Sequence, residues 1–539
     1  MSNNFKKAID RQMWVQVTPS PNAHAAGGSL ACDMRNDISR NPFIYQLVNN
    51  TNLNRFNGIT KGWQSLGSPA LGGTFGAGAG MVFAPSFSLV GAIAAGSTTT
   101  SITTSTTITA IGVNMLANRG GSGEYGFRVR IIGNSAGGSG KIEERWIIAN
   151  TGGTTPTLTL DSALTFTPAV GDTYEILGGR LFMFGASTLA AASFRQLELA
   201  TNTLTSLTNT GLPATIGTDF SGVALDEQYV PYDHKPGEGF IIGASNYDLS
   251  GIVKYCLVAT NSAAGTITGQ ATGGDASLLE NEYRNFQIRI IEDTAIPTAV
   301  GQRRIIASHT AGASPVYTLG SNWTVTPSTT AKYVIEFPNQ LLVWSSGTAV
   351  TYTYNYTNAV INNGTTSMNA GTWSATYFGN RGGNMAAGCT SFASFGIEPD
   401  IAKNSRHSFI FSFRGGGTTL DMFDISGGAN GTWSNAIVYD GVAPTVTTGT
   451  CGKYAPVDNE GRFGYMNIYS ASVTNQIYRF DVKNRVLQSF TPTDWIQAGT
   501  AAAGDRVATY CAIDGTDKYT LIFLLSHTST ISQEIIIQV

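Results

Sequence analysis

The chain has 539 residues, of which 12% are charged and 42% are hydrophobic, and it contains 63 glycines. So few charges exclude a coiled coil or a long helical protein, whereas the apolar and aromatic content is ample for a large core and excludes a disordered chain. The 32 basic and 35 acidic residues form no block of like charge, and the sequence therefore predicts no specific nucleic-acid partner and no attraction to an acidic membrane.

Residues 1–87 are predicted to begin a large body of β-sheets. Met1–Asp10 lack the apolar run of a secretory signal, and no later apolar stretch reaches the ~18 residues that are needed to cross a membrane. We therefore expect no membrane insertion and a chain that is made and folded in a cytoplasm. Phe43–Leu47 and Trp63–Leu66 are expected to supply outer strands to a closing sheet, whose inner strands come from the C-terminal part of the chain.

An internal duplication is the clearest pattern in the chain. Residues 88–179, called module 1 below, and residues 263–339, called module 2, contain matching segments in the same order and at nearly constant spacing. Each copy alternates apolar and polar residues with period two, and glycine, proline and asparagine interrupt the runs, which predicts several short strands. We expect two homologous inserted β-domains. The matched segments are Phe127–Ile132 with Phe286–Ile291, Trp146–Ala149 with Arg304–Ala307, Pro156 with Pro315, and Tyr174–Ile176 with Tyr333–Ile335.

Ahead of the matched segments of module 1 lies Ser97–Thr109, a run in which threonine and serine predominate. β-branched residues suit an extended backbone, so we expect an exposed strand here. A flexible linker is the alternative that the composition leaves open.

Residues 180–262 and 340–539 repeat a weaker pattern, in which an apolar strand, a turn, a second strand and an Asn or Gly turn precede an aromatic residue or a leucine. Four-stranded sheets that pack radially need tight hairpins and apolar faces, so the pattern predicts the blades of a propeller. The C-terminal strands would close the ring with the N-terminal ones and leave no exposed sheet edge. The predicted strands include Arg180–Phe184, Leu341–Trp344, Phe409–Phe413, Ile477–Val482, Arg506–Tyr510, Tyr519–Leu525 and Glu534–Val539.

Two parts of the chain resemble known proteins. The blade pattern, with its glycine pairs Gly178-Gly179 and Gly427-Gly428, resembles kelch or galactose-oxidase-type propellers, and this resemblance implies a fold without a particular activity. Segments of both modules are similar to small β-modules of tailed-bacteriophage structural proteins, which implies a virion component in a tail, baseplate, neck or capsid-associated position. The segments are Gly140–Asn150, Thr157–Leu160, Phe166–Pro168 and Tyr174–Ile176 in module 1, and Gly301–Ala307, Trp323–Pro327 and Tyr333–Ile335 in module 2.

Candidate catalytic and metal-binding groups are few. The five histidines show no spacing that is typical of a metal site. Asp233 and His234 could form an acid–base pair, but their Pro- and Gly-rich surroundings favour a surface turn. The five cysteines are odd in number and scattered, which favours buried thiols over disulfides. The histidines are His24, His234, His309, His407 and His527, and the cysteines are Cys32, Cys256, Cys389, Cys451 and Cys511.

Two pairs of acidic residues are candidates for the carboxylates of a hydrolase. Glu143 and Glu144 are neighbours, and Glu280 and Glu282 lie close together. Adjacent residues on a strand point to opposite faces, so they cannot share a substrate as the carboxylates of a glycosidase do. A solvated strand surface is therefore expected for them.

Two further motifs have structural explanations. Asn430–Ser434 lacks the aspartate of a sialidase-type turn, so this motif does not indicate a hydrolase. Tyr352, Tyr354 and Tyr356 alternate on one face of a strand, and we expect them to be buried between blades, although stacking on sugar rings is the alternative.

The sequence thus predicts an all-β fold, a roughly six-bladed kelch-like β-propeller with two homologous inserted small β-domains. The domains expected are 1–87 (propeller start), 88–179 (module 1), 180–262 (blades), 263–339 (module 2) and 340–539 (blades with closing strands). The expected function is that of a non-enzymatic structural protein of a phage virion, assembled in the cytoplasm of a bacterial host. Its partners would be other copies of itself and other virion proteins. No catalytic residue, cofactor or metal ligand is predicted, and the alternatives are a virion adhesin that binds a host surface glycan and a propeller carbohydrate-active enzyme.

Overall fold

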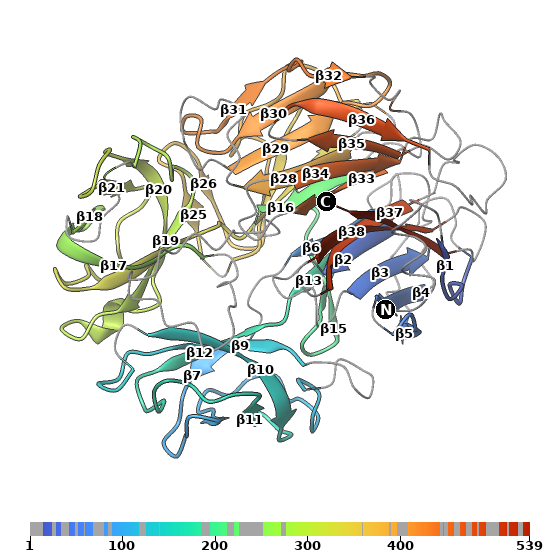
Figure 1. The fold of residues 1–539 in the computed structure, drawn as a ribbon. Helices are drawn as coiled ribbons and strands as arrows, with labels where there is room; N and C mark the ends of the chain where they lie inside the picture. The colour runs from blue at the N-terminus through green and yellow to red at the C-terminus, as the bar shows by residue number, and fades with distance from the viewer. Residues whose placement is uncertain are drawn as a thin grey trace.

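The computed structural model is built from β-sheets (Figure 1), and the residues that it describes contain no α-helix. Nearly all strand pairs are antiparallel, and β32 (Asp440–Gly441) runs parallel to its neighbour. The predicted all-β class is therefore confirmed. The structure describes residues 15–23, 29–33, 43–48, 52–58, 60–67, 80–84, 89–117, 126–138, 141–184, 194–212, 220–225, 252–270, 276, 278–345, 347–357, 359–386, 390–395, 408–441, 446, 451–456, 464–469, 477–481, 484–491, 506–514, 517–525 and 532–538.

Outside the two modules, β25 (Ile361–Asn362) and β26 (Ser367–Met368) form a two-stranded sheet. The other six sheets that the described residues form there are called the six-sheet body below. Each has four antiparallel strands, and the fifth sheet carries β32 as an additional edge strand. The first sheet contains β2 (Ser29–Asp33), β3 (Phe43–Val48), β4 (Asn52–Asn57) and β5 (Trp63–Gly67). The second contains β6 (Gly80–Ala84), β13 (Arg180–Phe184), β14 (Phe194–Glu198) and β15 (Thr203–Ser206). The third contains β16 (Phe220–Ala224), β23 (Gln340–Ser345), β24 (Tyr352–Asn355) and β27 (Trp373–Ser374).

The remaining three sheets follow in chain order. The fourth contains β28 (Thr390–Phe395), β29 (Ser408–Phe413), β30 (Leu420–Asp424) and β31 (Thr432–Ser434). The fifth contains β33 (Cys451–Pro456), β34 (Gly464–Tyr469), β35 (Ile477–Asp481) and β36 (Val486–Phe490). The sixth contains β37 (Arg506–Asp514), β38 (Asp517–Leu525), β39 (Ser532–Gln538) and β1 (Val15–Gln16).

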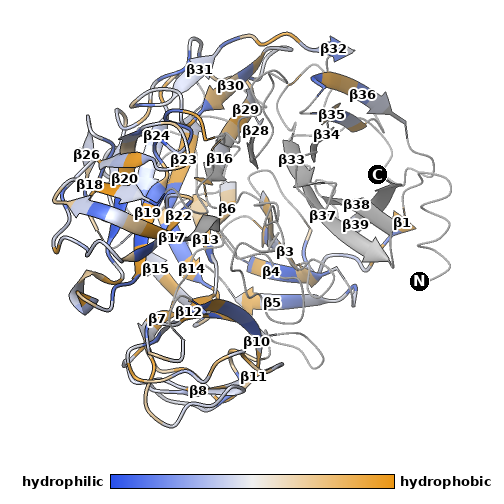
Figure 2. Cartoon of the chain, turned by 60° about the vertical axis from the view of Figure 1, so that its left-hand side comes forward, coloured by the Kyte–Doolittle hydropathy of each residue, from blue (hydrophilic) through white to orange (hydrophobic). Residues whose placement is uncertain are grey.

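The first strands of these sheets contact one another in a closed cycle. The contacts run from β2 to β6, β16, β28, β33 and β37, and β37 in turn contacts β2. Figure 2 shows hydrophobic and hydrophilic residues mixed along β4 and β5 of the first sheet. Neighbouring sheets thus cover one another along the cycle, and the start and the end of the chain meet.

The pairing of the chain ends differs from the prediction. Phe43–Leu47 and Trp63–Leu66, expected in the closing sheet, lie in the separate sheet that β2 begins. The closing sheet is instead completed by Val15–Gln16, where Val15 pairs with Glu534 of β39. A strand of two residues carries no periodicity that a sequence pattern can reveal, which explains why the prediction is wrong here.

The two modules share one strand order. Module 1 is inserted between β6 and β13 of the second sheet, and module 2 is inserted between β16 and β23 of the third sheet. In module 1 the order is β7-β12-β9-β10-β11-β8, and an isolated bridge between Ile93 and Thr104 links the two edges; in module 2 the equivalent strands close into a barrel. Module 1 contains β7 (Leu89–Ala92), β8 (Ser101–Thr103), β9 (Arg128–Ile132), β10 (Ile142–Asn150), β11 (Thr157–Leu160) and β12 (Thr173–Leu177). Module 2 contains β17 (Ile252–Ala263), β18 (Thr266–Gly269), β19 (Gln287–Glu292), β20 (Arg303–His309), β21 (Val316–Leu319) and β22 (Lys332–Glu336).

The strand register corrects one part of the sequence match. Ile147 donates its backbone N–H to the carbonyl of Phe127, and Ile306 donates to Phe286, both at 2.9 Å. Ile147 is therefore equivalent to Ile306, whereas the sequence match sets it beside Ile305. The isoleucine doublets made both registers plausible, but a shift of one residue turns every side chain of a strand to the other face. Equivalent residues below follow this structural register.

Two expected boundaries also change. Module 2 was expected to begin at residue 263, but its first strand spans Ile252–Ala263 and pairs with β18 and β22. In the threonine-rich run Ser97–Thr109 only Ser101–Thr103 form a strand, and Ile102 within it is buried. Module 2 therefore starts earlier than its recognisable repeat. In the threonine-rich run, the expected strand is confirmed for three residues only, and none of the three is exposed.

Aromatic side chains fill the space between the second and the third sheet. The rings of Phe194 and Tyr354 meet edge to face with 5.0 Å between their centroids, and the ring centroids of Tyr354 and Trp373 lie 4.9 Å apart. Tyr352 and Tyr356 are buried in the same cluster. The expected burial of these three tyrosines between sheets is confirmed, and it raises the pKa of Tyr354 to about 12.

Candidate functional site

In module 1 a row of buried charges crosses three neighbouring strands. Arg130 of β9 lies between Glu144 of β10 and Glu175 of β12. Glu144 forms ion pairs with Arg130 at 2.7 Å and with Arg128, and all of these side chains are at most 2% exposed. Buried charges are stable only when they are paired. The alternation of sign in this row supplies that pairing.

In module 2 the equivalent row has a different charge pattern. Arg289 of β19 lies directly opposite Arg303 of β20, and Val334 of β22 lies on its other side. Like charges directly opposite each other on adjacent strands destabilise a sheet. Glu336, one row further along, forms an ion pair with Arg289. Arg303 therefore depends on a carboxylate from outside module 2.

Glu175 of module 1 provides this carboxylate. It contacts Arg289, and it lies 3.2 Å from Arg303 and 3.8 Å from Arg130. Burial alone would raise the pKa of Glu175, but the three guanidinium groups outweigh it and hold the pKa below its ordinary value. The two modules consequently lie against each other, and a charge of one module completes the buried row of the other.

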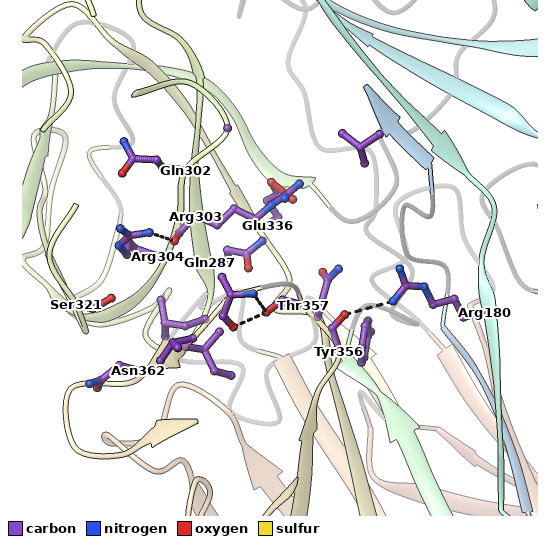
Figure 3. A pocket seen from close by; sticks show the side chains of 17 residues that line it. Arg180, Gln287, Gln302, Arg303, Arg304, Ser321, Glu336, Tyr356, Thr357 and Asn362 are labelled. Carbon is purple, nitrogen blue, oxygen red and sulfur yellow. Dashed lines mark hydrogen bonds between the residues drawn. The ribbon is translucent and has the colours of Figure 1, made fainter. Parts of the chain in front are cut away.

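A cavity of about 250 Å³ lies beside this charge network (Figure 3). Module 2 contributes Arg303, Arg304 and Gln287 to its lining, the six-sheet body contributes Arg180, and module 1 contributes Val90. Figure 3 shows Arg303 and Arg304 on one side and Arg180 on the other, with Gln287 between them. Three separate parts of the chain therefore meet at this cavity.

The network and the cavity together carry an excess of positive charge. The six arginines of this region face four carboxylates, Arg180 being paired with Glu198 at 3.2 Å. No carboxylate of the described residues pairs with Arg304, whose guanidinium lies 5.4 Å from the ring of Trp323. Burial lowers the pKa of both Arg303 and Arg304. The arginines are Arg128, Arg130, Arg180, Arg289, Arg303 and Arg304, and the carboxylates are Glu144, Glu175, Glu198 and Glu336.

The structure corrects the prediction for the acidic pairs. Glu143 and Glu144 were expected on a solvated surface, but both are fully buried. Glu143 pairs with Arg145 at 2.7 Å, whereas Glu144 belongs to the buried row of module 1. Their paired arginines make burial favourable, and the sequence rule about opposite faces says nothing about which faces are covered. Of the second pair, Glu282 is buried and Glu280 is exposed.

Only one of the five histidines, His309, lies within the described residues. Its Nε2 accepts the backbone N–H of Tyr283 at 2.8 Å, and its Nδ1 lies 3.0 Å from the carbonyl of Thr310. Burial lowers the pKa of His309. The described part of the chain holds no group of three or more His, Cys, Asp or Glu side chains that could bind a metal ion. Asp233 and the other four histidines lie outside the described residues.

Two other predictions can be compared with the structure. Cys32 is buried, as expected for the cysteines, while the side chains of the other four lie outside the described part. Asn430–Ser434 forms the turn into β31 and the whole of that strand. No helix of the described residues is long and apolar enough to cross a membrane.

The sequence analysis did not identify the buried arginines that lie where the two modules meet. Arg128 and Arg130 alternate with apolar residues in β9, and Arg289 repeats one of them in β19. Charged residues inside a strand of otherwise apolar character indicate either a solvated face or a buried ion-pair row. The change of Glu144 to Arg303 between the equivalent positions was the signal that could have distinguished them, because a repeat that swaps sign needs a new partner.

Comparisons with known proteins leave the family open. No protein-family profile matches the chain, and no curated protein is similar to it. A solved structure of a protein of unknown function from Bacteroides thetaiotaomicron is similar over 51% of this chain and 68% of its own, with 8% identity and a TM-score of 0.18. A leech intramolecular trans-sialidase is similar over 99% of this chain and 94% of its own, with 8% identity and a TM-score of 0.20. Neither likeness is strong enough to carry an argument about function.

Proposed function

We propose that the chain is a non-enzymatic structural component of a tailed-phage particle, in which a rigid body holds two copies of a β-module in fixed positions. The observation that carries the proposal is the position of Glu175 against Arg289 and Arg303. A buried ion pair between two modules fixes their relative orientation, because separating them would leave unpaired charges. Rigid presentation of two similar surfaces is what a component of a repeating assembly needs.

The six-sheet body is proposed to be a six-bladed, kelch-like propeller. The closed cycle of contacts between first strands supports this arrangement, because propeller blades place their first strands around a common axis. The sheet that combines β1 with β37–β39 supports it as well, since ring closure by both chain ends removes an exposed edge. The scaffold would then owe its rigidity to closure.

Module 2 is also anchored to the six-sheet body directly. Ile305 packs in one core cluster with Trp344 of β23. Asn285 donates from Nδ2 to the carbonyl of Ile425 at 2.7 Å, and Ser426 donates from Oγ to the carbonyl of Glu282 at 2.8 Å. Asn285 is 1% exposed, so its hydrogen bond to Ile425 is shielded from solvent. The second module is therefore fixed to both the body and module 1, which supports an architectural mechanism.

The place on a virion rests on the resemblance of the modules to phage β-modules. Other copies of the chain and other virion proteins would be the partners, bound through weakly charged surfaces of the modules and loops. Mass spectrometry and cryo-electron microscopy of purified particles from the source test this. We expect the chain in stoichiometric amounts and in a symmetric position. Absence from particles, with a monomeric purified chain, would refute the proposal.

Two other functions lead to different results. A virion adhesin would bind a glycan through the isolated chain, and the positively charged cavity is the observation that favours it. A carbohydrate-active propeller enzyme would turn over sugars, and a glycosidase screen of the purified chain detects it.

A further inference from the structure

The lining of the cavity between the modules contains guanidinium groups that retain unused donors. Arg304 donates from Nε to the carbonyl of Asn322 at 2.7 Å, from Nη1 to the carbonyl of Arg303 at 2.7 Å, and from Nη2 to Oγ1 of Thr324 at 3.0 Å. These bonds use three of its five N–H groups. Arg303 is 34% exposed, and among the described residues its side chain donates to Glu175 alone. Both arginines can therefore donate further hydrogen bonds into the cavity.

A comparison of the two modules shows that the free charge of Arg304 is specific to module 2. The equivalent residue of module 1 is Arg145, which makes the same type of backbone contacts, to the carbonyls of Ala163 and Glu144. Arg145, however, is neutralised by Glu143 at 2.7 Å.

Module 2 has Gln302 at the position of Glu143. Its Oε1 accepts the backbone N–H groups of Thr324 at 2.8 Å and Val325 at 3.1 Å, so it supports the same loop that Glu143 supports through Thr165. The structural role is kept and the negative charge is absent. An amide in place of the carboxylate leaves Arg304 open to an external anion.

A second observation points to a ligand. Gln287 lines the cavity and is 2% exposed, and its Nε2 has no hydrogen-bond partner among the residues that the structure describes. A buried amide N–H without a partner destabilises the fold, and an acceptor on a bound molecule would remove this cost. Glu336, the carboxylate among the described lining residues, is already ion-paired with Arg289. The unpaired donors of the lining thus outnumber its free negative charge.

The remaining lining favours a hydroxylated molecule over a bare inorganic ion. Asn339, Asn362 and Ser321 present amide and hydroxyl groups, which both donate and accept. Val90 is 48% exposed at the same cavity and offers an apolar contact. A volume of about 250 Å³ lies below the ~300–1,000 Å³ that is usual for drug-sized ligands, so the occupant is small.

We propose that this cavity binds a small acidic sugar of the hexuronate class, whose carboxylate is held by Arg304 and whose hydroxyl groups meet Arg303, Gln287 and the other amides. A planar carboxylate matches the fork of a guanidinium group. The inference goes beyond the architectural function and is independent of it, because a virion scaffold without this site remains a scaffold. The same chemistry is offered by a free hexuronate and by the end of an acidic polysaccharide.

Isothermal titration of the full chain tests the proposal, with glucuronate, glucose and inorganic phosphate as separate probes. We expect saturable binding of one glucuronate per chain, and binding of glucose that is weaker by about tenfold or more, because glucose lacks the carboxylate. Methyl glucuronide distinguishes the sources. Binding equal to that of glucuronate indicates the end of a polysaccharide, whereas binding of the free sugar alone indicates a free hexuronate, and either result supports the site.

Three variants locate the site. Gln302→Glu installs the residue that module 1 has at this position and neutralises Arg304, so it should weaken glucuronate binding by about tenfold or more. Arg304→Gln should do the same. Lys332→Gln is the matched control, since it removes one positive charge of module 2 that pairs with Glu292 and does not line the cavity. Its affinity should equal that of the unaltered chain, and the melting temperature of each variant shows that it is folded.

Several outcomes overturn the proposal. Glucuronate that does not bind saturably, or glucose that binds equally well, excludes an acidic-sugar site. Unchanged affinity in folded Gln302→Glu, or an equal loss in Lys332→Gln, excludes this cavity as the location. Binding of phosphate without glucuronate leaves an anion site but refutes the sugar.

Discussion

Replacing Glu175 by glutamine tests whether the two modules are held together by a single carboxylate. Glutamine keeps the shape and an acceptor oxygen, so the change removes charge and little else. Arg289 and Arg303 would then face each other across β19 and β20 without a common counter-charge. Removal of one partner from a buried ion pair costs about 3–5 kcal/mol. We expect a loss of this size in the free energy of unfolding of the module pair.

Thermal unfolding and hydrogen exchange measure the effect. Exchange should rise in peptides that cover β12, β19 and β20, because these strands lose the contact that covers them. Glu198→Gln is the matched control, since Glu198 pairs with Arg180 across two strands of one sheet and its loss leaves the contact between the modules intact. A Glu175→Gln variant as stable as this control, with unchanged exchange in the three strands, would refute the reasoning.

A second substitution distinguishes lost charge from general damage. Arg303→Glu, added to Glu175→Gln, places a carboxylate opposite Arg289, as Glu144 lies opposite Arg130 in module 1. The double variant should recover part of the lost stability. The pKa of Glu175 is lowered in the folded protein. The ion pair of Glu175 with Arg289 therefore stabilises the fold at pH values above the ordinary carboxylate pKa of about 4.5, and this stabilisation is lost as the pH falls through the lowered pKa. Acid should therefore erase the difference between Glu175→Gln and the unaltered chain.

Two further predictions concern module 2. His309 has a lowered pKa in the fold, so lowering the pH below 6.5 protonates the unfolded chain first and should destabilise the protein. His309→Gln, which keeps an acceptor for Tyr283, should lose this pH dependence in urea unfolding, and an unchanged slope contradicts the prediction. Gly320→Ala would drive a methyl group into the carbonyl of Asn362 and should cost about 1–3 kcal/mol in thermal unfolding. Gly137→Ala has open space, and an equal loss there would show that the clash is not the cause.

Local pattern was sufficient for the class of fold and for most strands of the six-sheet body. Phe409–Phe413 and Ile477–Val482 were predicted as strands, and the structure has β29 and β35 at almost these positions. The alternation of apolar and polar residues is imposed by a sheet with covered faces, so it is written into each strand separately. The duplication of the modules was visible for the same reason, because copies keep their core residues.

Long-range pairing was beyond the reach of the sequence. The closing strand is Val15–Gln16, and nothing in a dipeptide indicates that it pairs with Glu534 more than 500 residues away. Phe43–Leu47 has the pattern of a strand in any sheet, so its assignment to the closing sheet was a guess about partners. The register of Ile147 against Ile306 was decided by hydrogen bonds to Phe127 and Phe286.

The sequence by itself determined that this protein is a β-structure with two copies of one module, because apolar periodicity and repetition are properties of the chain. Only the tertiary structure decided what the charges of those modules do. Glu143, Glu144 and Glu175 look alike along the chain, yet one supports a loop, one pairs within module 1 and one lies between two arginines of module 2. A charge acquires its role from the groups that burial sets around it, and burial depends on contacts between distant segments.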